Sequence, residues 1–264
     1  MAFRRNILFF FFFTSALVNA SLGYGPVTLG VSSNFLETMK LLKKEFEKEH
    51  PSALSLVSGP TGLLYAQIKR GAPLDLFFSA DEKRPKKLEE EGLTHPGGIF
   101  VYAYGSLVLV RKKGSSLPLD LKLLKERKGP FPLMAIANPK TAPFGEAGLE
   151  TLKSHGLYEG MESEGKLIRG ENAGKAFYYV SSGHVGLGLV SKSFVLDPKK
   201  SSLIGGFSEV PPSHYEGIKQ TAVVLKGKMN KNVEAFLLFL NSKKARSIIK
   251  KMGYGLPPRK GPSP

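Results

Sequence analysis

Four short polar clusters occur in the 264-residue sequence where an apolar run gives way to a helical pattern. They are Ser32-Ser33-Asn34, Ser58-Gly59-Pro60-Thr61-Gly62, Pro143-Phe144-Gly145 and Asn172-Ala173-Gly174. The first turn of a helix has backbone N–H groups without intrahelical partners and carries the positive end of the helix dipole. Several helix starts directed at one cleft would therefore hold an anion without a charged side chain. One such cluster would be ordinary capping, but four together favour an anion site.

Patterns that would support catalysis or a metal centre are missing from the sequence. The chain has no Cys, which excludes a thiolate metal site, a cysteine nucleophile and a disulfide framework. Its five His residues show no zinc-ligand spacing, and neither H-E-x-x-H nor G-x-S-x-G occurs. The glycine-rich run from Gly183 to Gly188 follows a predicted helix and precedes a strand, the reverse of the order in a nucleotide-binding loop. We predict a protein that is not an enzyme and has neither a cofactor nor a bare metal ion.

The first 20 residues have the pattern of a secretory signal peptide. Arg4 and Arg5 precede an apolar run from Ile7 to Phe13, and small residues lead up to Ala20. The run is shorter than the ~20 residues that cross a bilayer, which argues against a membrane anchor. We expect cleavage near Ala20. Since no Cys is available for lipid attachment, we expect a soluble periplasmic protein.

The composition is globular and strongly basic. Lys and Arg number 38 against 22 Asp and Glu, a formal charge of +16, and 42% of the residues are hydrophobic, too many for a disordered chain. The lysines occur in short pairs along separate predicted helices and loops, and the chain has no Trp. A basic face with aromatic platforms is therefore not indicated, and we expect no nucleic-acid partner.

Alternating strand and helix patterns around these clusters predict an α/β fold. Apolar runs and helical periodicity predict strands at 27–31, 53–57, 74–78, 133–137 and 186–190, and helices at 35–46, 63–70, 81–91, 143–155, 173–180, 233–240 and 243–251. Asn34, with Glu37 three residues later, and Asn172 are predicted N-caps. A polar loop is expected between Gly156 and Asn172.

Two longer strands predict crossings between two lobes. Val101 to Val110 is broken at Gly105, and Ile218 to Leu225 would return the chain to the first lobe. The expected division is a signal peptide at 1–20, a first lobe at 21–104 plus 218–257, a second lobe at 105–217, and a loose tail at 258–264.

Three runs in the first half resemble the periplasmic molybdate-binding proteins of ABC importers. They are Val31-Ser32-Ser33-Asn34-Phe35, Ser58-Gly59-Pro60-Thr61-Gly62-Leu63-Leu64-Tyr65-Ala66-Gln67-Ile68, and Gly71-Ala72-Pro73-Leu74-Asp75-Leu76-Phe77-Phe78-Ser79-Ala80-Asp81. The resemblance extends from about Val27 to Tyr254 and includes the closing Met252-Gly253-Tyr254. It implies the type II periplasmic-binding-protein fold. In that fold two lobes, each a mixed sheet flanked by helices, are joined by two crossover strands, and neutral donors hold an oxyanion between them.

Residue by residue, the resemblance places Ser33, Asn34 and Thr61 against the anion from the first lobe. From the second lobe it implies the backbone N–H groups of Phe144 and Ala173. Ser191 matches a position where some members have a Tyr whose hydroxyl reaches the anion, and the shorter Ser leaves this contact open.

The function implied by the resemblance is that of an exported receptor that binds molybdate, and tungstate, in the interlobe cleft. Its partners would be the oxyanion and the membrane subunits of an ABC transporter, and it would act as a monomer. A receptor of the same fold for another small oxyanion, such as sulfate or phosphate, is the alternative. A basic exported protein that binds an acidic polymer is a weaker alternative, and an exported hydrolase is the weakest because no nucleophile and base pair is visible.

Overall fold

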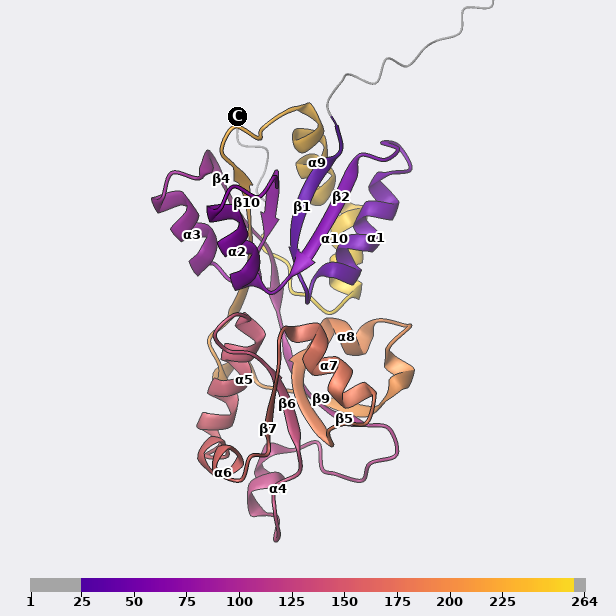
Figure 1. The fold of residues 1–264 in the computed structure, drawn as a ribbon. Helices are drawn as coiled ribbons and strands as arrows, with labels where there is room; N and C mark the ends of the chain where they lie inside the picture. The colour runs from indigo at the N-terminus through magenta and orange to yellow at the C-terminus, as the bar shows by residue number, and fades with distance from the viewer. Residues whose placement is uncertain (1–24, 259–264) are drawn as a thin grey trace, which may run out of the picture.

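The computed structural model describes residues 25–258, which form two α/β lobes joined by extended segments (Figure 1). The predicted signal peptide at 1–20 and residues 259–264 of the predicted tail lie outside the described residues. Within residues 25–258, none of the helices has the length and apolar character needed to cross a membrane.

The lobe at the top of Figure 1 is built on a mixed five-stranded sheet with the order β2-β1-β3-β10-β4. The strands are β1 (Val27–Ser32), β2 (Leu54–Gly59), β3 (Leu76–Phe78), β4 (Thr94–Gly105) and β10 (Ile218–Leu225). The first three strands run parallel, and β10 pairs antiparallel with β3 and β4. The helices are α1 (Leu36–Phe46), α2 (Thr61–Lys69), α3 (Lys83–Glu90), α9 (Lys231–Asn241) and α10 (Lys243–Lys251).

Helices cover both faces of this sheet, and the side chains of β3 show how the two cores are divided. Leu76 and Phe78 belong to the core that includes residues of α1, α9 and α10, whereas Phe77 belongs to the core under α2 and α3. Successive residues of a strand point to opposite faces, so an uninterrupted apolar run is expected where both faces are buried.

The lower lobe in Figure 1 has a second mixed sheet with the order β7-β6-β8-β5-β9 and one large core. The strands are β5 (Leu107–Lys112), β6 (Met134–Ala137), β7 (Leu167–Gly170), β8 (Leu187–Ser191) and β9 (Ile204–Glu209). The helices are α4 (Leu121–Glu126), α5 (Pro143–Ser154), α6 (Tyr158–Ser163), α7 (Ala173–Ser181) and α8 (Lys192–Leu196), with 3-10 turns η1 (Ser201–Leu203) and η2 (Pro212–His214).

The expected polar loop between Gly156 and Asn172 is wrong, because this segment contains α6 and β7. The helix has six residues and the strand four, too short for a periodic pattern to appear in the sequence. The strand is defined by its parallel pairing with β6, which is a tertiary contact. The short elements α4, α8 and β9 escaped prediction for the same reason.

The chain passes from the first sheet to the second between Gly105, the last residue of β4, and Leu107, the first residue of β5. A Cβ atom at Gly105 would lie 2.8 Å from the ring of Phe144, so the close approach of the two lobes favours glycine there. The strand from Ile218 to Leu225 was expected to return the chain to the first lobe, with the second lobe ending at residue 217. In the structure β10 lies wholly in the first sheet, and the chain leaves the second lobe in residues 210–217, directly before it.

Candidate functional site

One small cavity between the lobes brings together residues of all four polar clusters. Its volume is about 10 Å³, and its lining consists of Ser33, Asn34, Pro60, Thr61, Ala142, Pro143, Phe144, Asn172 and Ala173. These residues lie where β1, β2, β6 and β7 end and where α1, α2, α5 and α7 begin. The space is about that of one water molecule, so a larger solute would have to enter and leave by movement of the lobes.

The lining supplies backbone donors that the protein itself does not use. Among residues 25–258, the backbone N–H groups of Asn34, Thr61, Phe144 and Ala173 have no hydrogen-bond partner. Each belongs to the residues that open a helix, where no intrahelical carbonyl is within reach. Two of these donors come from each lobe, so a ligand in the cavity would be bonded by both lobes at once.

Thr61 is the first residue of α2, two residues earlier than the sequence predicts. Its hydroxyl is buried and does not cap the helix. Thr61 Oγ1 lies 2.7 Å from Ser32 Oγ and accepts a hydrogen bond from the backbone N–H of Ala80 at 3.4 Å. The neighbouring Ser33 donates its backbone N–H to the Gly59 carbonyl at 3.1 Å, so its hydroxyl is the group that remains for a ligand.

Asn34 does not cap α1, contrary to the sequence prediction. Phe35 occupies the N-cap position, and the expected capping-box residue Glu37 forms an ion pair with Lys40 instead. The Asn34 side chain donates from Nδ2 to Gln220 Oε1 at 2.8 Å and to the Tyr254 hydroxyl at 3.1 Å. Both amide hydrogens are used, and Asn34 therefore offers its backbone N–H to the cavity.

Tyr254 and Ser193 hold the Asn34 carbonyl from two directions. The Tyr254 hydroxyl donates to Asn34 O at 2.7 Å, and Ser193 Oγ in the second lobe donates to the same oxygen at 3.0 Å. Burial raises the pKa of Tyr254 to about 12, against the opposing effect of hydrogen bonds to Ser193, Asn34 and Ser191. Tyr254 thus remains a neutral donor throughout the neutral and mildly basic range.

Sequence reasoning missed these supporting residues, although Gln220 could have been noticed as a polar amide in a predicted strand whose following residues are almost all apolar. In the structure it is fully buried in β10. A buried amide needs partners, and Gln220 has them in Asn34, the Tyr102 hydroxyl at 3.2 Å and the Ala80 carbonyl at 3.4 Å. Ser191, whose contact with the anion the sequence left open, is not among the cavity-lining residues, and its hydroxyl lies 2.9 Å from Ser193 Oγ.

The second lobe presents mainly backbone to the cavity. Asn172 caps α7 as predicted, with its Oδ1 accepting from the Lys175 N–H at 3.0 Å. Pro143 is the first residue of α5, where the missing N–H costs nothing, and Phe144 follows it. Phe144 is buried, and its backbone N–H has no hydrogen-bond partner among residues 25–258.

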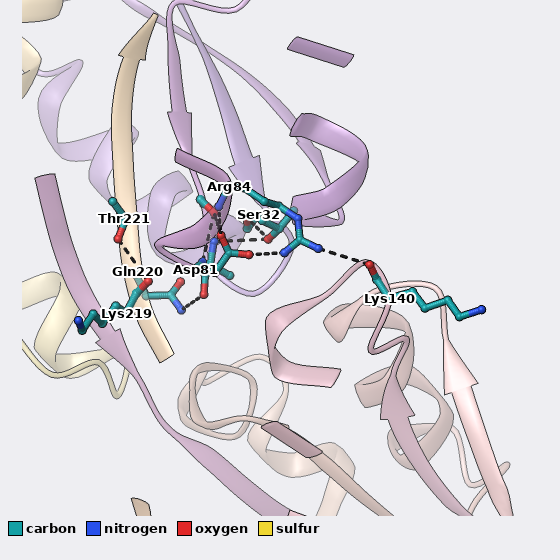
Figure 2. Close-up of polar contacts among 10 residues, drawn as sticks. Ser32, Asp81, Arg84, Lys140, Lys219, Gln220 and Thr221 are labelled. Atoms are coloured by element: carbon teal, nitrogen blue, oxygen red, sulfur yellow. Dashed lines mark hydrogen bonds and ion pairs between the residues drawn. The ribbon is translucent and has the colours of Figure 1, made fainter. Parts of the chain in front are cut away.

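Charged side chains lie near the cavity but do not line it. Arg84 forms an ion pair with Asp81 and donates across the lobe boundary to the Lys140 carbonyl at 3.4 Å (Figure 2). Beside this contact the Gly62 N–H donates to the Thr141 carbonyl at 2.9 Å. Within residues 25–258, no group of three or more His, Asp or Glu is placed to hold a metal ion. The site can therefore bind an anion through neutral donors and helix dipoles.

Comparisons with known proteins agree with this geometry. The family model described as "Bacterial extracellular solute-binding protein" matches residues 27–255. Molybdate-binding protein ModA of Azotobacter vinelandii is 41% identical over 232 residues, which cover 87% of this chain and 90% of that protein. ModA of Rhodobacter capsulatus is 38% identical over 239 residues, covering 87% and 88%.

A solved structure of the periplasmic molybdate-binding protein of Azotobacter vinelandii superposes with a TM-score of 0.80 at 35% identity, covering 88% of this chain and 99% of that one. The two-lobed periplasmic-binding-protein fold expected from the sequence is thereby confirmed. With a family match that spans nearly all the described residues, the chain belongs to the bacterial extracellular solute-binding protein family.

Proposed function

We propose that this protein binds molybdate, and also tungstate, between its lobes and delivers the anion to the membrane subunits of an ABC transporter. It works as a monomeric receptor in the periplasm after removal of its signal peptide near Ala20, and it catalyses no reaction. The proposal assigns ligand contacts to the hydroxyls of Ser33 and Thr61 and to the backbone N–H groups of Asn34, Thr61, Phe144 and Ala173.

The observation that supports this proposal most is the meeting of four helix starts, each with an unpaired N–H, at one cavity lined by neutral residues. Each helix N-terminus is equivalent to about half a positive charge, so four of them balance a dianion without a Lys or Arg in contact with it. The similarity to two proteins named for molybdate binding points to the same solute class.

A panel of oxyanions in a thermal-shift assay tests the ligand. Molybdate or tungstate at ~1,000 times its dissociation constant stabilises the folded protein by about 4 kcal/mol. Each kcal/mol raises the melting temperature of a chain of this size by roughly 2–4 °C. We expect large shifts for these two anions and small ones for sulfate and phosphate. Equal shifts for all four anions would contradict the assignment.

Sulfate or phosphate remains the alternative solute for this fold. Selectivity against them would come from the size of the cavity that the lobes form around the bound anion, because the helix starts within each lobe are fixed by core packing and do not contract easily onto a smaller ion. Competition calorimetry with molybdate against each anion decides between the two solute classes. Displacement of molybdate by an equal concentration of sulfate would favour the alternative.

The neutral lining also predicts how binding depends on conditions. No lining residue titrates between roughly pH 6 and 9, so the dissociation constant should be nearly constant over that range. Because the contacts are buried, equilibrium affinity should depend weakly on salt, whereas the association rate can fall with salt if surface lysines attract the anion. A steep loss of affinity with salt would instead place a charged side chain in the site.

A further inference from the structure

Ser32 lies behind the cavity rather than in its lining. It is the last residue of β1 and 1% exposed, and its hydroxyl is 2.7 Å from that of Thr61. Figure 2 shows Ser32 at the end of its strand, within the cluster of polar contacts that includes Asp81 and Arg84. No ligand contact was expected for Ser32 from the sequence.

A ligand in the cavity would determine which of the two hydroxyls donates to the other. A hydroxyl has one proton to donate and two lone pairs that accept. Among residues 25–258, Thr61 Oγ1 is the only hydrogen-bond partner of Ser32 Oγ. In either direction one of the two buried hydroxyl protons has no acceptor among residues 25–258, which is unfavourable. Only Thr61 lines the cavity, so a ligand there can accept the remaining proton only when Ser32 donates to Thr61. Ser32 is therefore the donor when an anion is bound.

With Ser32 as the donor, the only hydrogen bond that Thr61 Oγ1 can still make is one that it donates. Its oxygen accepts from Ser32 and from the Ala80 N–H, which occupies both lone pairs. Its own proton is then free for a ligand in the cavity that Thr61 lines. A hydroxyl that accepts hydrogen bonds is also a stronger donor, because bonds in a chain polarise one another.

We infer that Ser32 is a positioning residue for anion binding: it fixes the Thr61 hydroxyl as a donor directed at the bound oxyanion. This inference rests on the proposed oxyanion site. It distinguishes Thr61 from Ser33, whose hydroxyl lines the same cavity but has no protein partner among residues 25–258 to orient its proton.

A double-mutant cycle with molybdate as the ligand tests the inference. We expect Ser32→Ala to weaken binding by about 3- to 10-fold, in the lower part of the range for directly coupled residues. In a Thr61→Ala background the same substitution should have almost no effect, because no hydroxyl remains to be oriented. In a Thr61→Ser background, which keeps the hydroxyl, the loss should persist.

Two further variants separate orientation from general damage. Ser208→Ala removes one hydroxyl that donates to the Leu119 carbonyl at 2.6 Å in the second lobe, outside the cavity lining, and should leave affinity unchanged. Ser32→Cys keeps the side chain close in size but donates weakly, so its affinity should lie between those of the parent and Ser32→Ala. It also provides a folded variant if Ser32→Ala is unstable.

The outcomes distinguish this inference from the proposed function. A parent protein that does not bind molybdate contradicts the proposed function. A parent that binds, with Ser32→Ala binding equally well or losing the same factor in both Thr61 backgrounds, contradicts the role of Ser32. If Ser32→Ala lowers the affinity for molybdate only when residue 61 has a hydroxyl, the result supports the role of Ser32.

Discussion

The two lobes face the same cavity with different kinds of donor. Besides the backbone N–H groups of Asn34 and Thr61, the first lobe offers the hydroxyls of Ser33 and Thr61. Side-chain hydrogen bonds hold these residues in place, from Thr61 to Ser32 and from Asn34 to Gln220 and Tyr254. The second lobe presents the backbone of two helix starts, and its lining residues are apolar except for a helix cap. A hydroxyl can be deleted by one substitution, whereas a backbone N–H survives nearly all of them. Affinity should therefore depend on side-chain type in the first lobe and on backbone position in the second.

The largest effect is expected from Ala173→Pro, which removes a backbone donor of the second lobe. Proline is tolerated at the first residue of a helix, and Asn172 before it is extended, as a residue preceding proline prefers. We expect affinity for molybdate to fall by about 150-fold, the upper end for a hydrogen bond to a charged group, because the ring also occupies space at the lining.

Calorimetry measures this loss, and thermal melting without ligand checks that α7 still forms. Ala173→Gly keeps the N–H and should bind nearly as the parent does. If Ala173→Pro binds as tightly as Ala173→Gly, the second lobe does not use this donor.

Thr61→Ala tests the side-chain donor of the first lobe. Losing one hydrogen bond to a charged ligand should weaken binding by about 10- to 150-fold, whereas Thr61→Ser should come close to the parent. Since the Thr61 hydroxyl does not cap α2, the substitution affects unliganded stability through its buried bond to Ser32 and not through the helix end. Binding by titration and melting must be measured separately, and equal affinity for Thr61→Ala would remove Thr61 from the site.

Gly62→Ala tests the contact between the lobes beside Thr61. A Cβ there would lie 3.3 Å from Thr141 Cα and O, a tight approach across the boundary. In the first turn of α2, however, Ala is a better helix former than Gly by up to about 1 kcal/mol. We expect the free protein to melt at the same or a higher temperature while affinity falls by about 10-fold, a size typical of coupled contacts. A parallel gain in stability and affinity would contradict this prediction.

The smallest effect on binding is expected from Phe144→Leu. The ring is buried beside Gly105 and contributes packing, while the ligand contact we propose is its N–H. A Phe to Leu change keeps the backbone and most of the apolar volume, so affinity should change by less than about threefold even if stability falls by about 1 kcal/mol. A large loss measured by calorimetry would show that the ring itself shapes the site.

The buried Tyr254 hydroxyl, which is bonded to Asn34, should make the stability of the protein depend on pH in the basic range. The pKa of Tyr254 is raised to about 12 by burial, above the ordinary value near 10. The neutral hydroxyl is favoured in the folded state. The stability that it contributes is therefore fully present below about pH 10 and is lost as the pH rises toward 12. Denaturant unfolding between pH 8 and 11 should show a free energy of unfolding that declines less in Tyr254→Phe than in the parent. A difference in unfolding free energy between the two proteins that does not change with pH would contradict the prediction.

Local patterns in the sequence determined much of this molecule. Apolar runs and helical spacing were enough for the main strands and for helices such as α2 and α7, because these elements bury continuous apolar surface. The cap at Asn172 was predictable because its partner is three residues away. Within each lobe the sequence also predicted that two helix starts lie together, since the ends of parallel strands in one α/β sheet meet at the same edge. The resemblance to a two-lobed family placed the two pairs opposite each other, at the cavity they share.

Tertiary structure alone decided which hydrogen bonds the polar residues make. Asn34 has the sequence context of a cap, yet its partners Gln220 and Tyr254 are 186 and 220 residues away. Ser32 and Thr61 are 29 residues apart, and no periodicity marks their contact. Apolar periodicity is a local property of the chain, whereas a buried donor is satisfied by whatever acceptor the packed fold brings to it. The sequence therefore determined where the cavity forms, and only the folded chain determined which donors remain free to bind an anion.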